Sequence, residues 1–157
     1  MAMINGNNTI LATFNGRQHF IDSCITYDPS GANLWRGTFI ESSRWTTNNI
    51  IYGRTASSSY FMGSEYSFEV EPDTVYHYTA TKTGPAILAV IINQYDSSGA
   101  YISTVGNQPD FGLLNDDILW TTPSNCKYWT ITYRDQHSVT TLTPEMVSDI
   151  ILEKVES

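Results

Sequence analysis

The stretch from Arg44 to Tyr60 contains the residue types that recognise a sugar ring. A sugar presents an apolar face and a rim of hydroxyl groups, so its site needs a flat aromatic side chain with amide, carboxylate or guanidinium partners. We take the following side chains as the candidate ligand-binding set: Trp45, Tyr52, Tyr60, Arg44, Asn48, Asn49 and Arg54. The alternative is that Trp45 and Tyr52 cap the core, because large aromatic side chains are usually mostly buried.

A second candidate surface consists of Trp120, Tyr128 and Arg134. These residues combine two aromatic rings with a guanidinium group, but they fall within two stretches that alternate as β-strands do. Packing within a sheet is therefore the favoured interpretation of this second set.

No arrangement of residues indicates catalysis, and we predict no catalytic residue. The histidines His19, His77 and His137 are scattered, and the chain contains neither a Gly-x-Ser-x-Gly nor a His-Glu-x-x-His motif. The run from Asp135 to Ser138 places the residue types of a triad next to one another, without the geometry that a triad requires. A glycosidase needs only two suitably spaced carboxylates, so that activity remains an open alternative among 16 acidic residues.

Oxygen ligands for calcium are present in one acidic segment: Asp110, Asn115, Asp116 and Asp117. The spacing of an EF-hand loop is absent, so we favour a solvated acidic loop and expect no cofactor, with a structural calcium as the alternative. Cys24 and Cys126 match no metal-ligand or redox spacing, which favours two reduced side chains; a disulfide is the alternative.

The charge balance limits the kinds of partner. Eight Lys and Arg residues against 16 Asp and Glu give a net charge of −8, which repels nucleic acid and anionic lipid. The longest apolar run, 86–92, is too short to span a membrane, and the first residues do not form a signal peptide. We expect a soluble protein that binds neither nucleic acid nor membranes, with an uncharged, hydroxyl-rich surface suited to sugars or proteins.

Strand patterns dominate from residue 64 to residue 134. The segment 64–71 places Tyr66, Phe68 and Val70 on one face, and 127–134 places Trp129 and Ile131 inward, with Tyr133 on the same face. The segment 86–95 is largely apolar and residues 87–92 are apolar on both faces, which predicts a strand buried within the structure. Asp96-Ser97-Ser98-Gly99 predicts a hairpin turn, and repeated short strands predict a sandwich.

The remaining segments are less regular. Segment 35–60 predicts a strand followed by long loops, and 149–154 predicts a closing strand rather than a short helix because of its β-branched residues. Near the N-terminus, 10–14 and 17–21 flank Asn15-Gly16, a dipeptide typical of type I′ hairpins, although a helix is the competing prediction. We therefore expect an N-terminal arm or hairpin over residues 1–31 and one domain over residues 32–157.

Several segments together resemble a known family. They are Asn33-Leu34-Trp35, Val70-Glu71-Pro72-Asp73-Thr74-Val75-Tyr76, Tyr95-Asp96-Ser97-Ser98-Gly99, Thr122-Pro123-Ser124-Asn125-Cys126-Lys127-Tyr128 and Leu152-Glu153-Lys154. In this order they resemble the carbohydrate-binding-module-like jelly rolls of bacteriophage tail and baseplate proteins, over about residues 32–157. The resemblance implies an all-β, two-sheet antiparallel jelly roll in the phage virion, in contact with other tail proteins. By analogy, residues 1–31 would serve attachment or homo-oligomerisation.

Three hypotheses about function follow. The first is a non-catalytic module that binds bacterial cell-wall polysaccharide or another host-surface glycan for adhesion. The second is a structural or assembly module of the virion, whose exposed aromatic residues are buried against another protein or another copy. The third is a glycan hydrolase.

Overall fold

The computed structural model describes residues 10–14, 17–21 and 33–155, in two compact units that comprise Met1–Ala32 and Asn33–Ser157. In the first unit, β1 (Ile10–Phe14) pairs antiparallel with β2 (Arg17–Ile21). The predicted hairpin is confirmed within the bounds expected, and the competing helix is wrong. The turn at Asn15-Gly16 lies outside the described residues.

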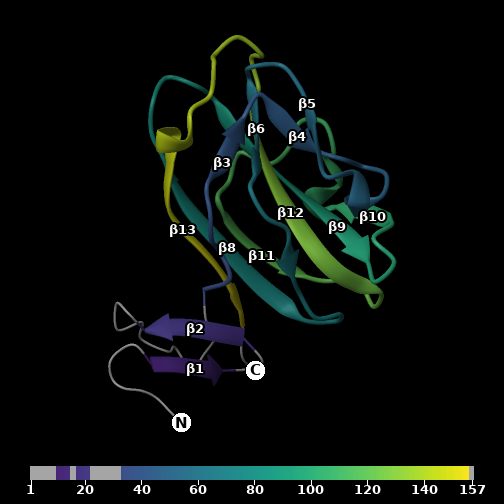
Figure 1. Ribbon diagram of the computed structural model, residues 1–157. Helices are drawn as coiled ribbons and strands as arrows, with labels where there is room; N and C mark the ends of the chain where they lie inside the picture. The colour runs from purple at the N-terminus through teal and green to yellow at the C-terminus, as the bar shows by residue number, and fades with distance from the viewer. Residues whose placement is uncertain (1–9, 15–16, 22–32, 156–157) are drawn as a thin grey trace. The chain divides into compact units, whose positions relative to one another are not determined.

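The second unit consists of two main antiparallel sheets and a small hairpin (Figure 1). The large sheet has the order β10-β9-β12-β6-β3, with β7 also paired to β12, and the small sheet has the order β11-β8-β13. The strands of the large sheet are β3 (Phe39–Glu41), β6 (Phe61–Ser64), β7 (Phe68–Glu69), β9 (Leu88–Asp96), β10 (Tyr101–Thr104) and β12 (Cys126–Asp135). Those of the small sheet are β8 (Val75–Lys82), β11 (Asp117–Thr121) and β13 (Val147–Lys154).

The hairpin and three short helical turns complete this unit. The hairpin pairs β4 (Ser43–Trp45) with β5 (Arg54–Ala56). The 3-10 turns are η1 (Ile50–Tyr52), η2 (Val105–Asn107) and η3 (Pro144–Met146).

The core lies between the two sheets. Trp129, Ile131 and Tyr133 of β12 are fully buried, as their alternation predicts. Tyr133 shares a hydrogen bond of 2.8 Å with the hydroxyl of Tyr78 in the small sheet, and the Trp129 ring lies 5.7 Å from that of Tyr76. The all-β, two-sheet antiparallel sandwich that the sequence predicts is therefore confirmed.

Strand β9 is buried along nearly its whole length, as its apolar faces predict. Part of the other side of the large sheet, which faces away from the core, is covered by the β4–β5 hairpin. The backbone N–H of Trp45 donates to Thr132 Oγ1 at 3.3 Å. The prediction of a strand followed by long loops in 35–60 is thus wrong in part, because two strands of this segment form a hairpin. Thr130 and Thr132 of β12 are buried.

The segment 64–71 departs from its pattern at one residue. Phe68 and Val70 are buried as predicted, whereas Tyr66 is 43% exposed. The chain bends between β6 and β7, where Ser64 Oγ donates to the Tyr66 carbonyl at 2.8 Å, and this bend interrupts the alternation.

Two further predictions are confirmed. The segment from Asp96 to Gly99 forms the turn between β9 and β10, in which the Gly99 N–H donates to the Asp96 carbonyl at 2.9 Å. Gly99 adopts a φ of 88°, a value that glycine tolerates without steric cost. The C-terminal segment is a strand, β13, and not a helix.

Candidate functional site

Trp45 and Arg54, from the candidate set, are fixed within the hairpin and the sheet below it. Trp45 is 7% exposed, and its indole Nε1–H donates to the Ser64 carbonyl at 2.8 Å. The Arg54 guanidinium lies 5.6 Å over the indole ring and donates to the carbonyls of Ser64 and Glu65 at 3.1 and 2.7 Å. Trp45 therefore occupies the position of a core cap, which is the alternative stated for it, and its role in ligand binding stays a prediction.

Asn48, Asn49 and Tyr52 lie around η1. Asn49 Oδ1 accepts the Ile51 N–H at 3.0 Å, and Asn49 Nδ2 donates to the Ser98 carbonyl at 3.2 Å, so this side chain joins η1 to the β9–β10 turn. The Asn48 carbonyl accepts the Tyr101 N–H at 2.8 Å. Tyr52 is 62% exposed, which leaves it as the accessible aromatic residue of this part of the set.

Arg44 and Tyr60 meet at Phe61, on the side of the large sheet that faces away from the core. The Arg44 guanidinium lies 4.5 Å over the Phe61 ring, and the Tyr60 ring centre is 5.1 Å from that of Phe61. Arg134 joins them, because it is paired with Phe61 across the β12–β6 register and its guanidinium lies 5.5 Å from the same ring. Two arginines thus flank one aromatic side chain.

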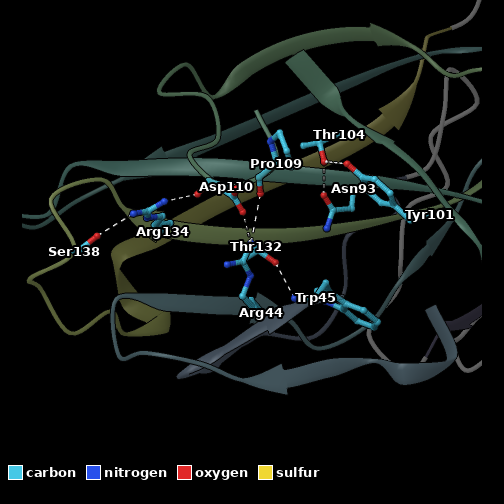
Figure 2. A network of polar contacts seen from close by, with 10 residues as sticks. All are labelled: Arg44, Trp45, Asn93, Tyr101, Thr104, Pro109, Asp110, Thr132, Arg134 and Ser138. Atoms are coloured by element: carbon cyan, nitrogen blue, oxygen red, sulfur yellow. Dashed lines mark hydrogen bonds and ion pairs between the residues drawn. The ribbon is translucent and has the colours of Figure 1, made fainter. Parts of the chain in front are cut away.

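A loop after η2 adds Asp110 and Phe111 to this group. The Arg134 guanidinium lies 4.8 Å over the Phe111 ring, and its Nη1 donates to the Asp110 carbonyl. Arg44 Nη2 lies 3.5 Å from Asp110 Oδ1 and 3.5 Å from the Pro109 carbonyl oxygen. Figure 2 marks both contacts. We call these residues the arginine–aromatic cluster: Arg44, Tyr60, Phe61, Asp110, Phe111 and Arg134.

Gly112 allows this loop to approach the sheet. Its φ is 74°, and a Cβ atom at this position would lie 2.7 Å from the carbonyl oxygen of Val90. Any other residue would therefore push the loop away from β9. The neighbouring Phe111 carbonyl accepts a hydrogen bond of 3.0 Å from Gln136 Nε2, which holds the loop on its other side.

The cluster is partly open to solvent. Phe111 is 54% exposed, and the side chains of Asp110 and Arg44 are 69% and 27% exposed. The pKa of Tyr60 is lowered, chiefly by a hydrogen bond with Ser58 and also by the positive charges of Arg134 and Arg44. The surface therefore combines an accessible ring, guanidinium donors and a positive field.

The second candidate surface is not formed as a unit. Trp120 belongs to β11 in the small sheet, where it packs against the core, while Tyr128 and Arg134 lie toward opposite ends of β12. Only Arg134 of this set joins the cluster. The sequence analysis missed Phe61 and Phe111 and considered Asp110 only as a calcium ligand, because their proximity depends on the β12–β6 register and on the loop that pairs with β9 at Val90.

The acidic segment is not wholly solvated as predicted. The Asp116 side chain is only 6% exposed, and its Oδ2 lies 3.5 Å from Lys82 Nζ. Burial raises the pKa of Asp116, while the charge of Lys82 opposes this shift. Asp117 Oδ1 instead lies 2.6 Å from His77 Nε2, and within the described ranges no three metal-ligating side chains lie close enough to hold an ion.

Asp135 begins the polar run of residues 135–138 and holds the following loop through hydrogen bonds to its carboxylate. Its carboxylate accepts N–H groups from Ile87, His137, Val139 and Thr140, at 3.2, 3.2, 3.2 and 2.8 Å. The side chain therefore organises a loop, in agreement with the interpretation of this run as a polar loop. Cys126 is buried, which raises the pKa of its thiol to about 11, and Cys24 lies outside the described residues.

A depression of about 210 Å³ lies on another part of this unit. It is lined by Lys82, Thr83, Gly84, Ala86, Ile87, Leu88 and Leu114. The Lys82 ammonium group already donates to the carbonyls of Leu88 and Leu114, at 2.8 and 2.6 Å. The depression is therefore a weaker candidate site than the cluster.

No known protein identifies a family for this chain, so a function can be proposed only from its own residues. Across the part of the chain that the structure describes, no helix has the length and apolar character needed to cross a membrane. No protein-family model, curated protein or solved structure matches the chain.

Proposed function

We propose that the sandwich of residues 33–155 is a non-catalytic saccharide-binding module and that the arginine–aromatic cluster is its binding surface. The observation that carries this proposal is the exposed Phe111 ring, which the Arg134 guanidinium contacts, together with the Arg44 guanidinium next to the neighbouring residue Asp110. An exposed ring face and fixed planar donors meet the two requirements of a sugar, an apolar face and bonded hydroxyls.

The arginines are held in position before any ligand arrives. Arg134 is restrained by the Phe111 ring, the Asp110 carbonyl and the Ser138 hydroxyl, the last at 3.0 Å from Nη2. Arg44 is restrained by the Phe61 ring. Side chains that are already ordered lose less conformational entropy on binding, which favours affinity for a weakly interacting ligand.

We propose a biological setting for this module from the resemblance of its sequence to phage tail and baseplate modules. In that setting the module belongs to a virion, contacts other tail proteins and binds bacterial cell-wall polysaccharide or another host-surface glycan during adhesion. Attachment or homo-oligomerisation through residues 1–31 belongs to the same proposal.

Binding of the purified chain to cells and extracted wall polysaccharide of candidate hosts tests this function. Phe111→Ala removes the exposed ring, and Leu119→Ala is the matched control, because Leu119 is 63% exposed on β11 of the other sheet. We expect saturable binding that Phe111→Ala weakens about tenfold, the equivalent of roughly 1.4 kcal/mol, and that Leu119→Ala leaves unchanged. Equal binding by both variants would show that the cluster is not the binding surface.

An assembly module is the second candidate, because two adjacent apolar residues of η1 are highly exposed. Ile51 is 78% exposed and Tyr52 is 62% exposed. Exposed apolar side chains that lie together are typical of protein contacts. Sedimentation of the chain and of Ile51→Ser tests this role, since self-association lost in Ile51→Ser, without glycan binding, favours assembly.

The hydrolase hypothesis is tested in the same polysaccharide assay. A non-catalytic module releases no new reducing ends during prolonged incubation with a polysaccharide that it binds. Steady release would favour the hydrolase instead.

A further inference from the structure

The arginine–aromatic cluster differs from the other cationic sites of the described chain in its charge balance. Lys127 lies 2.8 Å from the carboxylate of Glu69 and Lys154 lies 3.0 Å from that of Glu71, so each of these cations has one carboxylate. Arg54 is a single cation whose guanidinium donates to two neutral backbone carbonyls, at 3.1 and 2.7 Å. In the cluster, two guanidinium groups face one carboxylate, that of Asp110. A chain with a net charge of −8 therefore concentrates positive charge at this surface.

The carboxylate of Asp110 is a weak partner of Arg44. Their closest atoms are 3.5 Å apart, longer than the roughly 2.7–2.9 Å of a charge-assisted hydrogen bond, and the Asp110 side chain is 69% exposed. An exposed pair at this separation is easily replaced, because water solvates both groups nearly as well. Asp110 thus marks where a carboxylate lies relative to Arg44, without filling that position tightly.

We propose that the saccharide bound by this module is acidic, and that a carboxylate of the sugar displaces Asp110 and pairs with Arg44 beside Arg134. This inference rests on the proposed saccharide-binding function and adds the chemical class of the ligand. The planar guanidinium matches a carboxylate with two parallel hydrogen bonds, a geometry that an ammonium group does not provide.

The surrounding side chains favour the same class of ligand. The Phe61 ring holds the plane of the Arg44 guanidinium from one side, at 4.5 Å, and the exposed Phe111 ring offers a surface for the sugar. The pKa of the Tyr60 phenol is lowered first by hydrogen bonds with Ser58 and Ser138, and the charges of Arg134 and Arg44 act in the same direction. The same two charges favour a ligand anion that lies between Arg44 and Arg134.

The test is calorimetric titration of the full chain with three probes: oligogalacturonate, a poly(ribitol phosphate) and dextran oligosaccharides. These carry carboxylate, phosphate and no charge, respectively. We expect oligogalacturonate to bind at least tenfold more tightly than dextran, with an affinity that falls as salt is added.

Substitutions test whether the preference for oligogalacturonate over dextran comes from the cluster. Arg44→Gln should abolish it, Arg44→Lys should restore it only in part, and Asp110→Asn should strengthen oligogalacturonate binding about threefold by removing the competing carboxylate. Arg36→Gln is the matched control, because it removes the same charge from an arginine that lies over Tyr66, outside the cluster. Circular dichroism of each variant confirms that it is folded.

Each contrary result has a distinct meaning. Dextran binding that equals oligogalacturonate binding and that Phe111→Ala weakens would overturn the acidic ligand and keep the proposed function. Binding of poly(ribitol phosphate) without binding of oligogalacturonate would show that the anionic group of the ligand is a phosphate, which would overturn the proposed carboxylate ligand. An equal loss in Arg36→Gln would show that net charge, and not the cluster, sets the preference. Failure to bind any of the probes or host polysaccharides would overturn both proposals.

Discussion

Arg44 and Arg54 lie on the two strands of one hairpin, yet their surroundings differ. Arg54 covers the Trp45 indole and donates to two backbone carbonyls at 3.1 and 2.7 Å. Arg44 lies over Phe61, and its two polar contacts, with the Pro109 carbonyl and the Asp110 carboxylate, are both longer, at 3.5 Å. The comparison shows that two arginines of one hairpin can differ in how tightly their guanidinium groups are hydrogen-bonded, and this difference is the reason why we propose Arg44, and not Arg54, as a ligand-binding residue.

The largest effect should come from removing the ring beneath Arg54. Trp45→Ala deletes a buried indole and its hydrogen bond to Ser64, so we expect a loss of about 3–5 kcal/mol in the free energy of unfolding. Urea denaturation followed by circular dichroism measures it. A loss below about 1 kcal/mol would show that the hairpin is not fixed by Trp45.

The two arginines should then separate in stability. Arg54→Ala leaves two carbonyls without their donor and is expected to cost about 1–3 kcal/mol. Arg44→Ala removes an exposed ion pair and is expected to cost less than about 1 kcal/mol. Paired urea titrations provide the measurement, and equal losses would show that the two arginines contribute equally to the fold.

The two buried carboxylates, Asp116 and Asp135, should make stability depend on pH in opposite directions. The pKa of Asp116 is raised by burial, with only partial compensation from Lys82, so its folded form binds a proton more tightly than its unfolded form. Its contribution to stability is therefore present at low pH and is lost as the pH rises from about 3.8 through the raised pKa. Asp116→Asn should flatten this decline, as measured by the thermal midpoint between pH 3.5 and 7.

Asp135 should show the opposite sign. Burial raises its pKa, but the backbone donors outweigh this effect and the net shift is downward. Its contribution is present above about 3.8, the ordinary pKa, and is lost as the pH falls through the lowered value. In the same series, Asp135→Asn should lose stability mainly above this range, and a pH profile identical to that of Asp116→Asn would contradict the assignment.

The smallest effect on stability is expected from substitution of Tyr52, the exposed aromatic residue of η1. Tyr52→Ala removes a side chain that is 62% exposed and should change the free energy of unfolding by less than about 0.5 kcal/mol. The same variant should bind polysaccharide like the unmodified protein. A tenfold loss of affinity in Tyr52→Ala would move the site to η1, where the sequence also placed it.

The sequence predicted the parts of the fold that depend on local pattern. Segment 127–134 alternates strictly, so Trp129 and Ile131 were correctly placed in the core. The β4–β5 hairpin was missed because its strands, Ser43–Trp45 and Arg54–Ala56, are short and carry little alternation. Its position over the sheet also buries Thr132, and strand periodicity contains no information about such a cover.

The candidate site was only partly predictable for the same reason. Residue types identified Arg44 and Tyr60, since guanidinium and phenol groups suit a sugar wherever they lie. Their association with Phe61 and Arg134 depends on the pairing of Arg134 with Phe61 across β12 and β6. Trp45 has the appropriate chemistry, but a hydrogen bond to Ser64 directs its indole into the protein.

Nuclear magnetic resonance of the side-chain N–H groups, during titration with the wall polysaccharide of a host, identifies the arginines that bind saccharide. We expect the Nε–H signals of Arg44 and Arg134 to shift in proportion to bound saccharide, while those of Arg54 and the Trp45 indole stay in place. Shifts confined to Trp45 and Arg54, with Arg44 and Arg134 unchanged, would contradict this expectation.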